Sequence, residues 1–476
     1  MNFRMLIDGA WADARGGRTW PVINPATEAK VADVPFGGAE EAHAAIDAAR
    51  RAQPAWAALT AYERGAFLAR AAALLRERQD ELAPVMTREC GKPLAESKRE
   101  WGLAADIFDW YAEEGKRAYG RVIPGRNPAK RLMAIHAPVG VVATITAWNF
   151  PGLLPARKWS AALAAGCTVV GRPSELTPMS GMALANMIAD AGFPKGVVNL
   201  VNGDPEAIGK AFLDSPHVDK ISFTGSQRVG RLLMKGAAEG IKRLALELGG
   251  SAPVLVFDDV DPEAAAKLAV AGKFRNNGQV CISPARFYVG RSIEKKFVEA
   301  AEAAVKALVV GDGSNAEVTL GPMVNAVGRE RVEAFVGDAV GKGVQVVTGA
   351  RRPKALERGY FYEPTLLRGA TPDMRLWREE VFGPVLPVAA ADGFEEALRQ
   401  ANDTPYGLAA FVLTRDLSTA IRAYEGLKFG IIGVNDFTPA TAEAPFGGMK
   451  QSGLGRECGP EGLHEFLETK LVSISL

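Results

Sequence analysis

Hydrophobic residues recur at helical spacing early in the chain and in short continuous runs further along it. An Ala-rich stretch over residues 39–59 and a stretch over residues 63–82 that carries Phe67, Leu68 and Leu74 predict two helices after a strand-like N-terminal segment. From Val139 onward, β-branched runs alternate with helical patterns. Strands are predicted at residues 139–146, 167–171, 197–201, 220–223 and 243–248, with helices that include residues 157–165 and 180–191. This alternation implies a parallel sheet with right-handed crossovers, which is a Rossmann-like arrangement.

A second alternating series follows Gly250 and predicts another α/β domain. Its strands are predicted at residues 253–257, 287–289, 344–348, 385–388 and 410–413, and its helices at residues 262–274 and 293–309. Residues 120–136 interrupt the first series with extended Pro- and Arg-rich sequence, and residues 468–475 alternate like a strand. These two extended segments could pair into an arm that docks on another subunit.

The composition is that of an ordinary globular protein and argues against several classes of function. Hydrophobic residues make up 48% of the 476 positions, and 56 basic side chains nearly balance 55 acidic ones. This balance gives no electrostatic case for binding nucleic acid or a membrane surface, and no apolar run reaches the roughly 18 residues of a membrane span. The charged N-terminus is unlike a signal peptide. Four cysteines without CxxC spacing suggest neither a metal site nor a disulfide framework, so we expect a reducing cytoplasm.

One cysteine and one glutamate lie in glycine-containing motifs. Cys281 ends a Gly-Gln-Val-Cys run, 34 positions after Glu247, which is followed by Leu-Gly-Gly. A lone cysteine is commonly a small core residue. The glycine and polar amides before Cys281 argue against a dry core site. The pair therefore suggests a nucleophile and a general base that folding brings together.

Two turns at strand ends suggest a dinucleotide site. The Phe-Thr-Gly-Ser run at 223–226, followed by Gly230, opens a predicted helix, and a helix N-terminus attracts phosphate. A plain strand–turn–helix explains it equally well. Glu175 follows another strand, where its carboxylate can accept hydrogen bonds from ribose hydroxyls and repel a 2′-phosphate, which favours NAD over NADP. The alternative is that Ser174 caps a helix with Glu175 in its first turn.

Two further loops carry polar groups suited to catalysis. Asn149, in a Trp-Asn-Phe-Pro loop, offers an amide N–H for an oxyanion, although such a loop can also be purely structural. Glu380 and Phe382 stand on a Gly-Pro turn, where they could hold a ribose and one face of a nicotinamide. Surface glutamates before a turn are the alternative reading.

Taken in order, these motifs resemble the NAD(P)-dependent aldehyde dehydrogenase family from end to end, closest to its succinate-semialdehyde dehydrogenase-like members. The matching runs lie at residues 148–151, 223–226, 246–250, 278–281, 380–384 and 445–448. The resemblance implies an α/β fold with a Rossmann-like cofactor domain, a second α/β catalytic domain and a small β arm for oligomerisation. The implied parts are an NAD-binding domain over 1–119 and 137–248, a catalytic domain over 249–445, an arm over 120–136 and 462–476, and a connecting segment over 446–461.

The resemblance also implies roles for individual residues. Cys281 corresponds to the nucleophile, Glu247 to the general base and Asn149, with the Cys281 backbone N–H, to the oxyanion hole. Glu457 matches a second family glutamate that relays protons. The implied cofactor contacts are Ile145, Trp148, Arg172, Ser174, Glu175, Gly225, Ser226, Gly230, Glu380 and Phe382. No metal is implied.

The implied reaction is the oxidation of an aldehyde to an acid through a thiohemiacetal and a thioester of Cys281, followed by hydrolysis of the thioester. The sequence departs from the family pattern at Arg172, where lysine is common, and at Ala147, where proline is usual. Ser283 stands where some semialdehyde members have a second cysteine, so a disulfide switch of that kind is not expected.

Two arginines bear on the substrate. Arg157 and Arg275 match positions at which succinate-semialdehyde dehydrogenases anchor the substrate carboxylate, and a guanidinium suits bidentate carboxylate recognition. Either one could instead cap a helix or pair with a structural acid. The loop over residues 436–442 diverges from that subfamily, and Thr441 is the residue there that could supply a hydroxyl. We therefore expect a carboxylate-bearing semialdehyde such as succinate semialdehyde; 2-oxoglutarate semialdehyde, glutarate semialdehyde, lactaldehyde and glycolaldehyde remain open.

Other activities are also compatible with this catalytic cysteine. A CoA-acylating semialdehyde dehydrogenase would resolve the thioester with a thiol, but that branch usually lacks a base at Glu247. A thioesterase or esterase would use the cysteine without hydride transfer, and a catalytically silent protein would not need these residues at all. The family resemblance further implies a homodimer or a homotetramer.

Overall fold

Two large sheets organise the chain, and the computed structural model describes all residues 1–476. The first sheet has eight strands in the order β19-β11-β10-β7-β8-β9-β1-β2. Its bounds are β1 Met5–Ile7, β2 Ala10–Ala12, β7 Val141–Ile145, β8 Thr168–Arg172, β9 Val198–Leu200, β10 Lys220–Gly225, β11 Arg243–Leu248 and β19 Gly453–Leu454. The five central strands, β11 to β9, run parallel. Because the chain winds outward from β7 in both directions, a ligand crevice is expected beyond the carboxyl ends of β7 and its neighbours.

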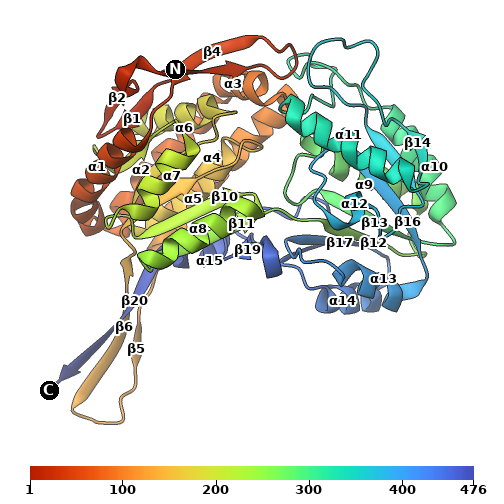
Figure 1. Cartoon of the computed structure of the whole chain (residues 1–476). Helices are drawn as coiled ribbons and strands as arrows, with labels where there is room; N and C mark the ends of the chain where they lie inside the picture. Colours follow the sequence, from red (N-terminus) through yellow and green to blue (C-terminus); the bar gives the residue numbers. More distant parts are fainter.

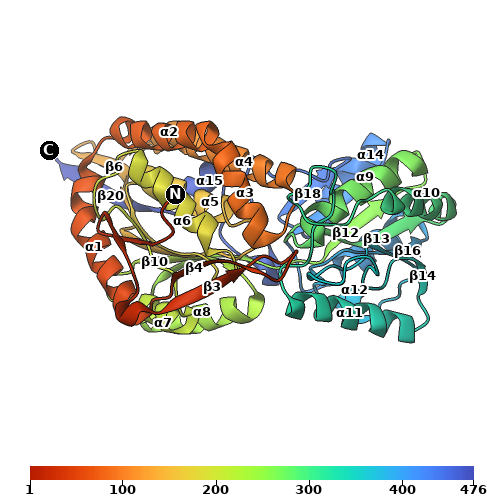
Figure 2. The same ribbon diagram turned by 90° about the horizontal axis from the view of Figure 1, so that it is seen from above.

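Helices cover both faces of this first sheet, as Figure 2 shows, with α7 and α8 on one side and α5 and α6 on the other. The helices are α1 Ala39–Ala58, α2 Ala61–Glu77, α3 Gln79–Cys90, α4 Leu94–Glu114, α5 Leu153–Ala165, α6 Pro178–Asp190, α7 Pro205–Asp214 and α8 Gln227–Glu239. Coverage on both faces explains why every residue of β8 is buried and why the strands read as continuous apolar runs. A separate hairpin joins β3 Thr19–Ile23 to β4 Lys30–Pro35.

The second sheet has seven strands in the order β14-β15-β16-β13-β12-β17-β18 and forms the other lobe in Figure 1. Its strands are β12 Ala252–Val256, β13 Pro284–Gly290, β14 Gln345–Thr348, β15 Thr365–Arg368, β16 Val385–Ala391, β17 Ala409–Leu413 and β18 Ile431–Val434. Its helices are α9 Pro262–Phe274, α10 Glu294–Lys306, α11 Ala326–Gly341, α12 Arg375–Arg378, α13 Gly393–Asn402 and α14 Leu417–Gly426. All its strands except β14 pair in parallel. The predicted α/β fold class is confirmed.

A three-stranded arm projects from the first lobe and carries the C-terminus at its tip (Figure 1). It contains β5 Arg121–Ile123, β6 Lys130–Pro138 and β20 Leu467–Ser475, and a short helix, α15 Gly459–His464, precedes β20. The strand β20 pairs antiparallel with β6 along its whole length, from Leu467 opposite Pro138 to Ser475 opposite Lys130. The two extended segments predicted from the sequence therefore do lie side by side.

The prediction of one helix over residues 63–82 is wrong, because the chain leaves helical geometry at Arg78. There φ is −100° and ψ is 15°, so α2 ends and α3 begins. The Arg78 side chain pairs with Glu81, at 2.7 Å, and with Asp190, at 2.8 Å. These ion pairs stabilise the break in a way that hydrophobic spacing cannot reveal. No helix in the structure is both long enough and apolar enough to cross a membrane.

Candidate active site

Cys281 lies in a loop between α9 and β13 whose backbone is unusual. Three consecutive residues, Asn276, Asn277 and Gly278, have positive φ angles of 46°, 57° and 71°. Asparagine and glycine tolerate this left-handed conformation better than other residues. Gly278 is required for a second reason, since a Cβ there would lie 2.2 Å from the carbonyl oxygen of Gly383. The turn leaves Cys281 as the only cysteine that is not fully buried.

Glu247 lies near the end of β11 and is buried, and neither of its carboxylate oxygens has a hydrogen-bond partner. Burial raises the pKa of Glu247 to about 7, and the charge of Glu457 contributes to the rise. Burial, and after it the Glu247 carboxylate, also raise the pKa of the Cys281 thiol well above its ordinary value. The two groups are therefore electrostatic neighbours. A carboxylate with this pKa can accept protons near neutral pH.

Asn149 follows β7 and is held against the cysteine loop. Its side-chain amide donates to the carbonyl of Gln279 at 3.1 Å, and its backbone carbonyl accepts from the Asn276 side chain at 2.9 Å. An amide NH₂ has two donors, so one remains for another acceptor after the Gln279 bond. The amide is thus adjacent to the segment that ends in Cys281, as an oxyanion donor must be.

Glu457 belongs to a cluster that the sequence did not predict. Lys158, on α5, forms an ion pair with one carboxylate oxygen of Glu457, and Arg157 approaches the other at 3.8 Å. Lys158 also donates to the hydroxyl of Ser222 at 3.2 Å. Glu457 is 299 positions from Lys158, so no local pattern could have joined them. The ion pair between Lys158 and Glu457 therefore links the surroundings of Glu247 to helix α5.

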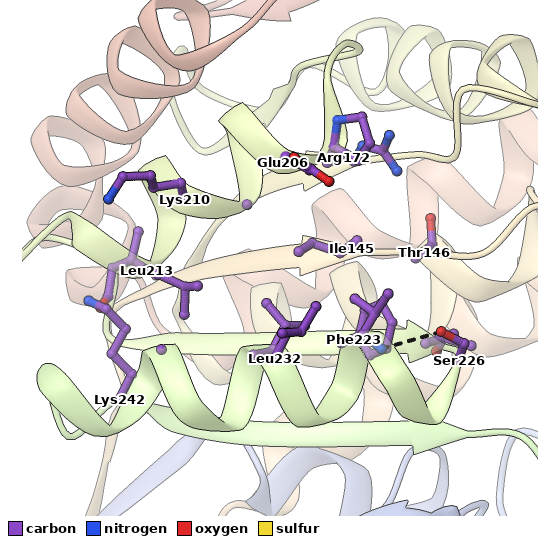
Figure 3. A pocket seen from close by; sticks show the side chains of 18 of the residues that line it. Ile145, Thr146, Arg172, Glu206, Lys210, Leu213, Phe223, Ser226, Leu232 and Lys242 are labelled. Atoms are coloured by element: carbon purple, nitrogen blue, oxygen red, sulfur yellow. Dashed lines mark hydrogen bonds between the residues drawn. The ribbon is translucent and has the colours of Figure 1, made fainter.

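A groove of about 1310 Å³ lies at the carboxyl ends of β7, β8 and β10 and continues between α7 and α8. Figure 3 shows Glu206 and Lys210 on the α7 side and Leu232 on the α8 side. Seven of the predicted cofactor residues line it: Ile145, Trp148, Arg172, Ser174, Glu175, Gly225 and Ser226. The fold therefore brings these seven residues to one surface.

The groove fits a dinucleotide. The N-terminus of the 13-residue helix α8 meets it at Ser226, whose hydroxyl accepts from the backbone N–H of Val229 at 3.3 Å. A helix N-terminus of this kind suits a pyrophosphate. Gly230 does not line the groove; it lets α8 pack against β11, because a Cβ there would lie 2.8 Å from the Leu248 side chain.

Arg172 and Glu175 form an ion pair at 2.5 Å in the groove wall. The Arg172 guanidinium also donates to the carbonyl of Gly203 at 3.2 Å, while its buried Nε atom has no partner. Ser174 is buried and accepts from the backbone N–H of Leu176 at 3.3 Å, a local turn contact. The pair holds the Glu175 carboxylate at the wall of the groove.

Glu380 and Phe382 lie outside the groove wall but next to residues that belong to the site. Glu380 accepts from the backbone N–H of Gly250 at 3.1 Å, and burial raises its pKa to about 7. Gly249 permits this approach, since a Cβ there would lie 2.2 Å from the Glu380 carboxylate. Phe382 has a positive φ of 54°, and its ring meets that of Trp148 edge-on at 5.5 Å.

A second cavity of about 640 Å³ includes Arg157 and Thr441 in its wall, together with apolar residues of α4 such as Ile107 and Trp110. Arg157 is buried, stacks on the Phe446 ring at 4.1 Å and has an unpartnered Nε atom. Its positive charge lowers the pKa of Cys281 against the opposing effect of burial. Thr441 is exposed at the edge of this cavity.

Arg275 does not line this cavity, but it lies near the same cysteine. Its guanidinium faces the Phe150 ring at 5.7 Å. Burial lowers the pKa of Arg275, while nearby acids, Glu96 and then Cys281, raise it. Both predicted arginines are therefore close to Cys281, and the Nε atom of Arg157 is buried without a hydrogen-bond partner.

Comparison with known proteins identifies the family. Residues 11–472 match the aldehyde dehydrogenase family. The chain is 47% identical to the succinate-semialdehyde dehydrogenase [NADP(+)] GabD of Escherichia coli K12, over 99% of this chain and 97% of that protein. It is 46% identical to a glutarate-semialdehyde dehydrogenase of Pseudomonas aeruginosa, over 98% of this chain and 96% of that protein. A crystal structure of succinate-semialdehyde dehydrogenase from Burkholderia pseudomallei superposes with a TM-score of 0.98 at 44% identity, covering 100% of this chain and 98% of that one. The chain therefore belongs to the aldehyde dehydrogenase family and is an NAD(P)-dependent oxidoreductase that acts on aldehydes.

Proposed function

We propose that this enzyme oxidises a carboxylate-bearing semialdehyde, with succinate semialdehyde as the leading candidate. The observation that carries the proposal is that two guanidiniums lie near Cys281: Arg157, which is buried with an unpartnered Nε atom, and Arg275, which has no carboxylate partner in the protein. Leaving donors without acceptors costs free energy that a substrate carboxylate would recover. The relatives named for succinate semialdehyde and glutarate semialdehyde support the same class of substrate.

In this proposal Cys281 attacks the aldehyde carbon as a thiolate, because the thiolate is the nucleophilic form of the side chain. The Asn149 amide and the Cys281 backbone N–H donate hydrogen bonds to the oxygen that becomes negative. A bound nicotinamide supplies the hydride acceptor. Glu247 then takes a proton from the water that hydrolyses the Cys281 thioester, and the acid leaves.

Glu457 and Lys158 complete this assignment. We place Glu457 as the group that exchanges protons with Glu247, since its charge influences the Glu247 pKa and one of its oxygens has no hydrogen-bond partner. Lys158 keeps the other oxygen in place. Thr441 is assigned to the substrate side, where it lines the same cavity as Arg157.

For the cofactor we propose NAD. Glu175 supports this choice, because a carboxylate in the groove wall can accept from the adenosine ribose hydroxyls and repels a 2′-phosphate. Glu380 is assigned to the ribose on the nicotinamide side, and Trp148 and Phe382 to the neighbouring nicotinamide. The Escherichia coli relative is named for NADP, so the two cofactors need to be compared directly.

The arm supports a proposed homodimer or homotetramer in the cytoplasm. One edge of its sheet is β20, which pairs only with β6, and exposed apolar residues such as Val122 and Leu471 lie on the arm. An unpaired strand edge with apolar side chains is a ready surface for another chain. The free thiols of all four cysteines agree with a reducing compartment.

The test is the initial rate of cofactor reduction with succinate semialdehyde and with butanal, each with NAD and with NADP. The two aldehydes share a four-carbon chain and differ in the carboxylate. We expect kcat/KM to favour succinate semialdehyde, and Arg275→Met to lower it roughly 10- to 100-fold for that aldehyde while butanal changes about threefold or less. Equal use of butanal by the unaltered enzyme would reject the semialdehyde proposal, and faster reduction of NADP would reject the cofactor proposal.

A further inference from the structure

A buried lysine lies behind the proposed oxyanion site. Lys92, between α3 and α4, has a side chain with no exposed surface. Its ammonium group pairs with Glu100 at 2.5 Å and donates to the backbone carbonyl of Asn149 at 2.7 Å. It also lies 4.2 Å from the centre of the Phe150 ring. The ion pair with Glu100 keeps the pKa of Lys92 raised despite its burial, so the group is charged.

Glu100 extends this contact to the helix that follows Asn149. One of its carboxylate oxygens accepts from Lys92, and the other accepts from the backbone N–H groups of Gly152 and Leu153, at 2.8 and 3.0 Å. These N–H groups belong to the first turn of α5, which otherwise has no capping side chain. Lys92 and Glu100 together therefore hold the segment 149–153 by hydrogen bonds at both of its ends.

The cysteine loop is tied to the same segment of α4. Glu96, one turn before Glu100, accepts from the backbone N–H of Asn276 at 2.9 Å. The Asn276 side chain in turn donates to the carbonyl of Asn149, which is the oxygen that Lys92 also binds. The Asn149 carbonyl thus receives one donor from Lys92, which precedes α4, and one from the loop that carries Cys281. Both loops of the proposed site are fixed to a single stretch of helix.

We propose that Lys92 is a positioning residue: by holding the Asn149 carbonyl it fixes the distance between the Asn149 amide and the carbon that Cys281 attacks. This inference rests on the proposed role of Asn149 as an oxyanion donor. A misplacement of about 1 Å can cost on the order of 100-fold in rate, although no contact with the substrate is lost. Removing Lys92 should therefore slow acylation of Cys281 without removing any group that touches substrate or cofactor.

A purely structural role is the competing explanation, and the chain contains a matched control for it. Lys220 is also buried, pairs with Glu465 at 2.7 Å, donates to the Glu465 carbonyl at 2.6 Å and lies 5.0 Å from the Phe466 ring. Its contacts are the same in kind as those of Lys92, but Glu465 and Phe466 are not part of the proposed site. Lys220→Met therefore measures how far the acylation rate falls when a buried lysine is lost away from the proposed site.

The experiment compares the full-length wild-type enzyme with Lys92→Met, Lys92→Arg and Lys220→Met. The first readout is p-nitrophenolate release from p-nitrophenyl acetate on rapid mixing without cofactor, because ester cleavage by Cys281 needs the same oxyanion site. Its amplitude counts competent sites, and its rate constant reports acylation. The second readout is kcat and KM for cofactor reduction with succinate semialdehyde and with butanal.

For Lys92→Met we expect the acylation rate constant to fall roughly 10- to 100-fold at an unchanged amplitude, with kcat reduced and KM nearly constant. Lys92→Arg keeps the charge but not the size or donor geometry of the ammonium group, so it should recover part of the rate. A Lys92→Met rate constant within about threefold of wild type, a loss confined to the amplitude, or an equal loss in Lys220→Met would overturn the proposal. If the wild-type enzyme proves indifferent between the two aldehydes, the semialdehyde proposal fails, yet the ester readout still decides the role of Lys92.

Discussion

At the scale of single residues, the site concentrates ionisable groups where water is scarce. Glu247 and Glu380 are both moved by burial to pKa values of about 7, and burial lowers the pKa of Lys273 to about 7 as well. Clusters of shifted groups are typical of catalytic sites, because chemistry near neutral pH needs acids and bases poised there. Such shifts arise only when the fold removes the groups from water.

The Glu247 carboxyl sets an expected pH dependence. A general base acts only when it is ionised, so with a pKa of about 7 it is increasingly protonated and inactive as pH falls below that value. We predict that kcat rises with pH through about 7 and then levels off. The check is a kcat profile measured from about pH 5.5 to 9 in the wild-type enzyme and in Glu247→Gln. A profile that keeps the same rising limb in Glu247→Gln would assign the limb to another group.

The sequence singled out Cys281 and Glu247 by neighbouring glycines and Asn149 by its place in a loop after a predicted strand, and the family resemblance gave all three their proposed roles. Sequence reasoning did not reach Lys92 and Lys158, whose partners lie 57 and 299 positions away at Asn149 and Glu457. A lysine that will be buried looks the same in a sequence as one that will face solvent. Its role follows only from the contacts that the fold creates.

At the scale of helices and strands, strong hydrophobic patterns predicted the five central strands of the first sheet and five strands of the second, but they missed β15 and β18. The same patterns failed at Arg78, where ion pairs end α2, and they did not predict α4, which carries Glu96 and Glu100. Element order follows from local spacing. The contacts between a helix terminus and a distant loop do not.

The substitution Gly230→Ala tests how closely α8 must approach β11. A methyl group there would lie 2.8 Å from Leu248, so Gly230→Ala should lower the free energy of unfolding by about 1 kcal/mol, because overpacking exceeds the gain in helix propensity. Gly337 in α11 has no atom within 4 Å of its virtual Cβ, and Gly337→Ala should raise the same free energy by about 0.5–1 kcal/mol.

Denaturant unfolding of both variants is the measurement for this pair. Opposite signs for the two substitutions are the expected result. A stabilised Gly230→Ala would mean that Leu248 moves aside without cost and that α8 does not depend on this close contact.

At the scale of the whole molecule, the chain forms two lobes and a projecting arm (Figure 1). Cys281 lies after α9, beside the second sheet, whereas Glu247 lies in β11 and Asn149 follows β7 in the first lobe. The groove proposed for the cofactor belongs to the first lobe. The proposed catalysis therefore depends on how the two lobes are held together, which no single motif encodes.

The arm gives a prediction about assembly. Leu471 on β20 is 70% exposed, and Leu471→Asp should reduce the mass of the assembly, because a charge is costly to bury between chains. Leu417 on α14 is 74% exposed in the other lobe, so Leu417→Asp is the matched control and should leave the mass unchanged. Light scattering after size exclusion reads the mass directly. A wild-type enzyme with the mass of one chain would contradict the proposed homodimer or homotetramer.

The central claim is that Cys281 carries the acyl group and Glu247 removes it. The most direct measurement is the intact mass of Glu247→Gln, quenched shortly after mixing with NAD and succinate semialdehyde, followed by mapping of any added mass to a peptide. The account predicts one succinyl group per chain, located on Cys281, together with a burst of reduced cofactor and slow turnover. Steady turnover with no added mass, or an acyl group on another residue, would contradict it.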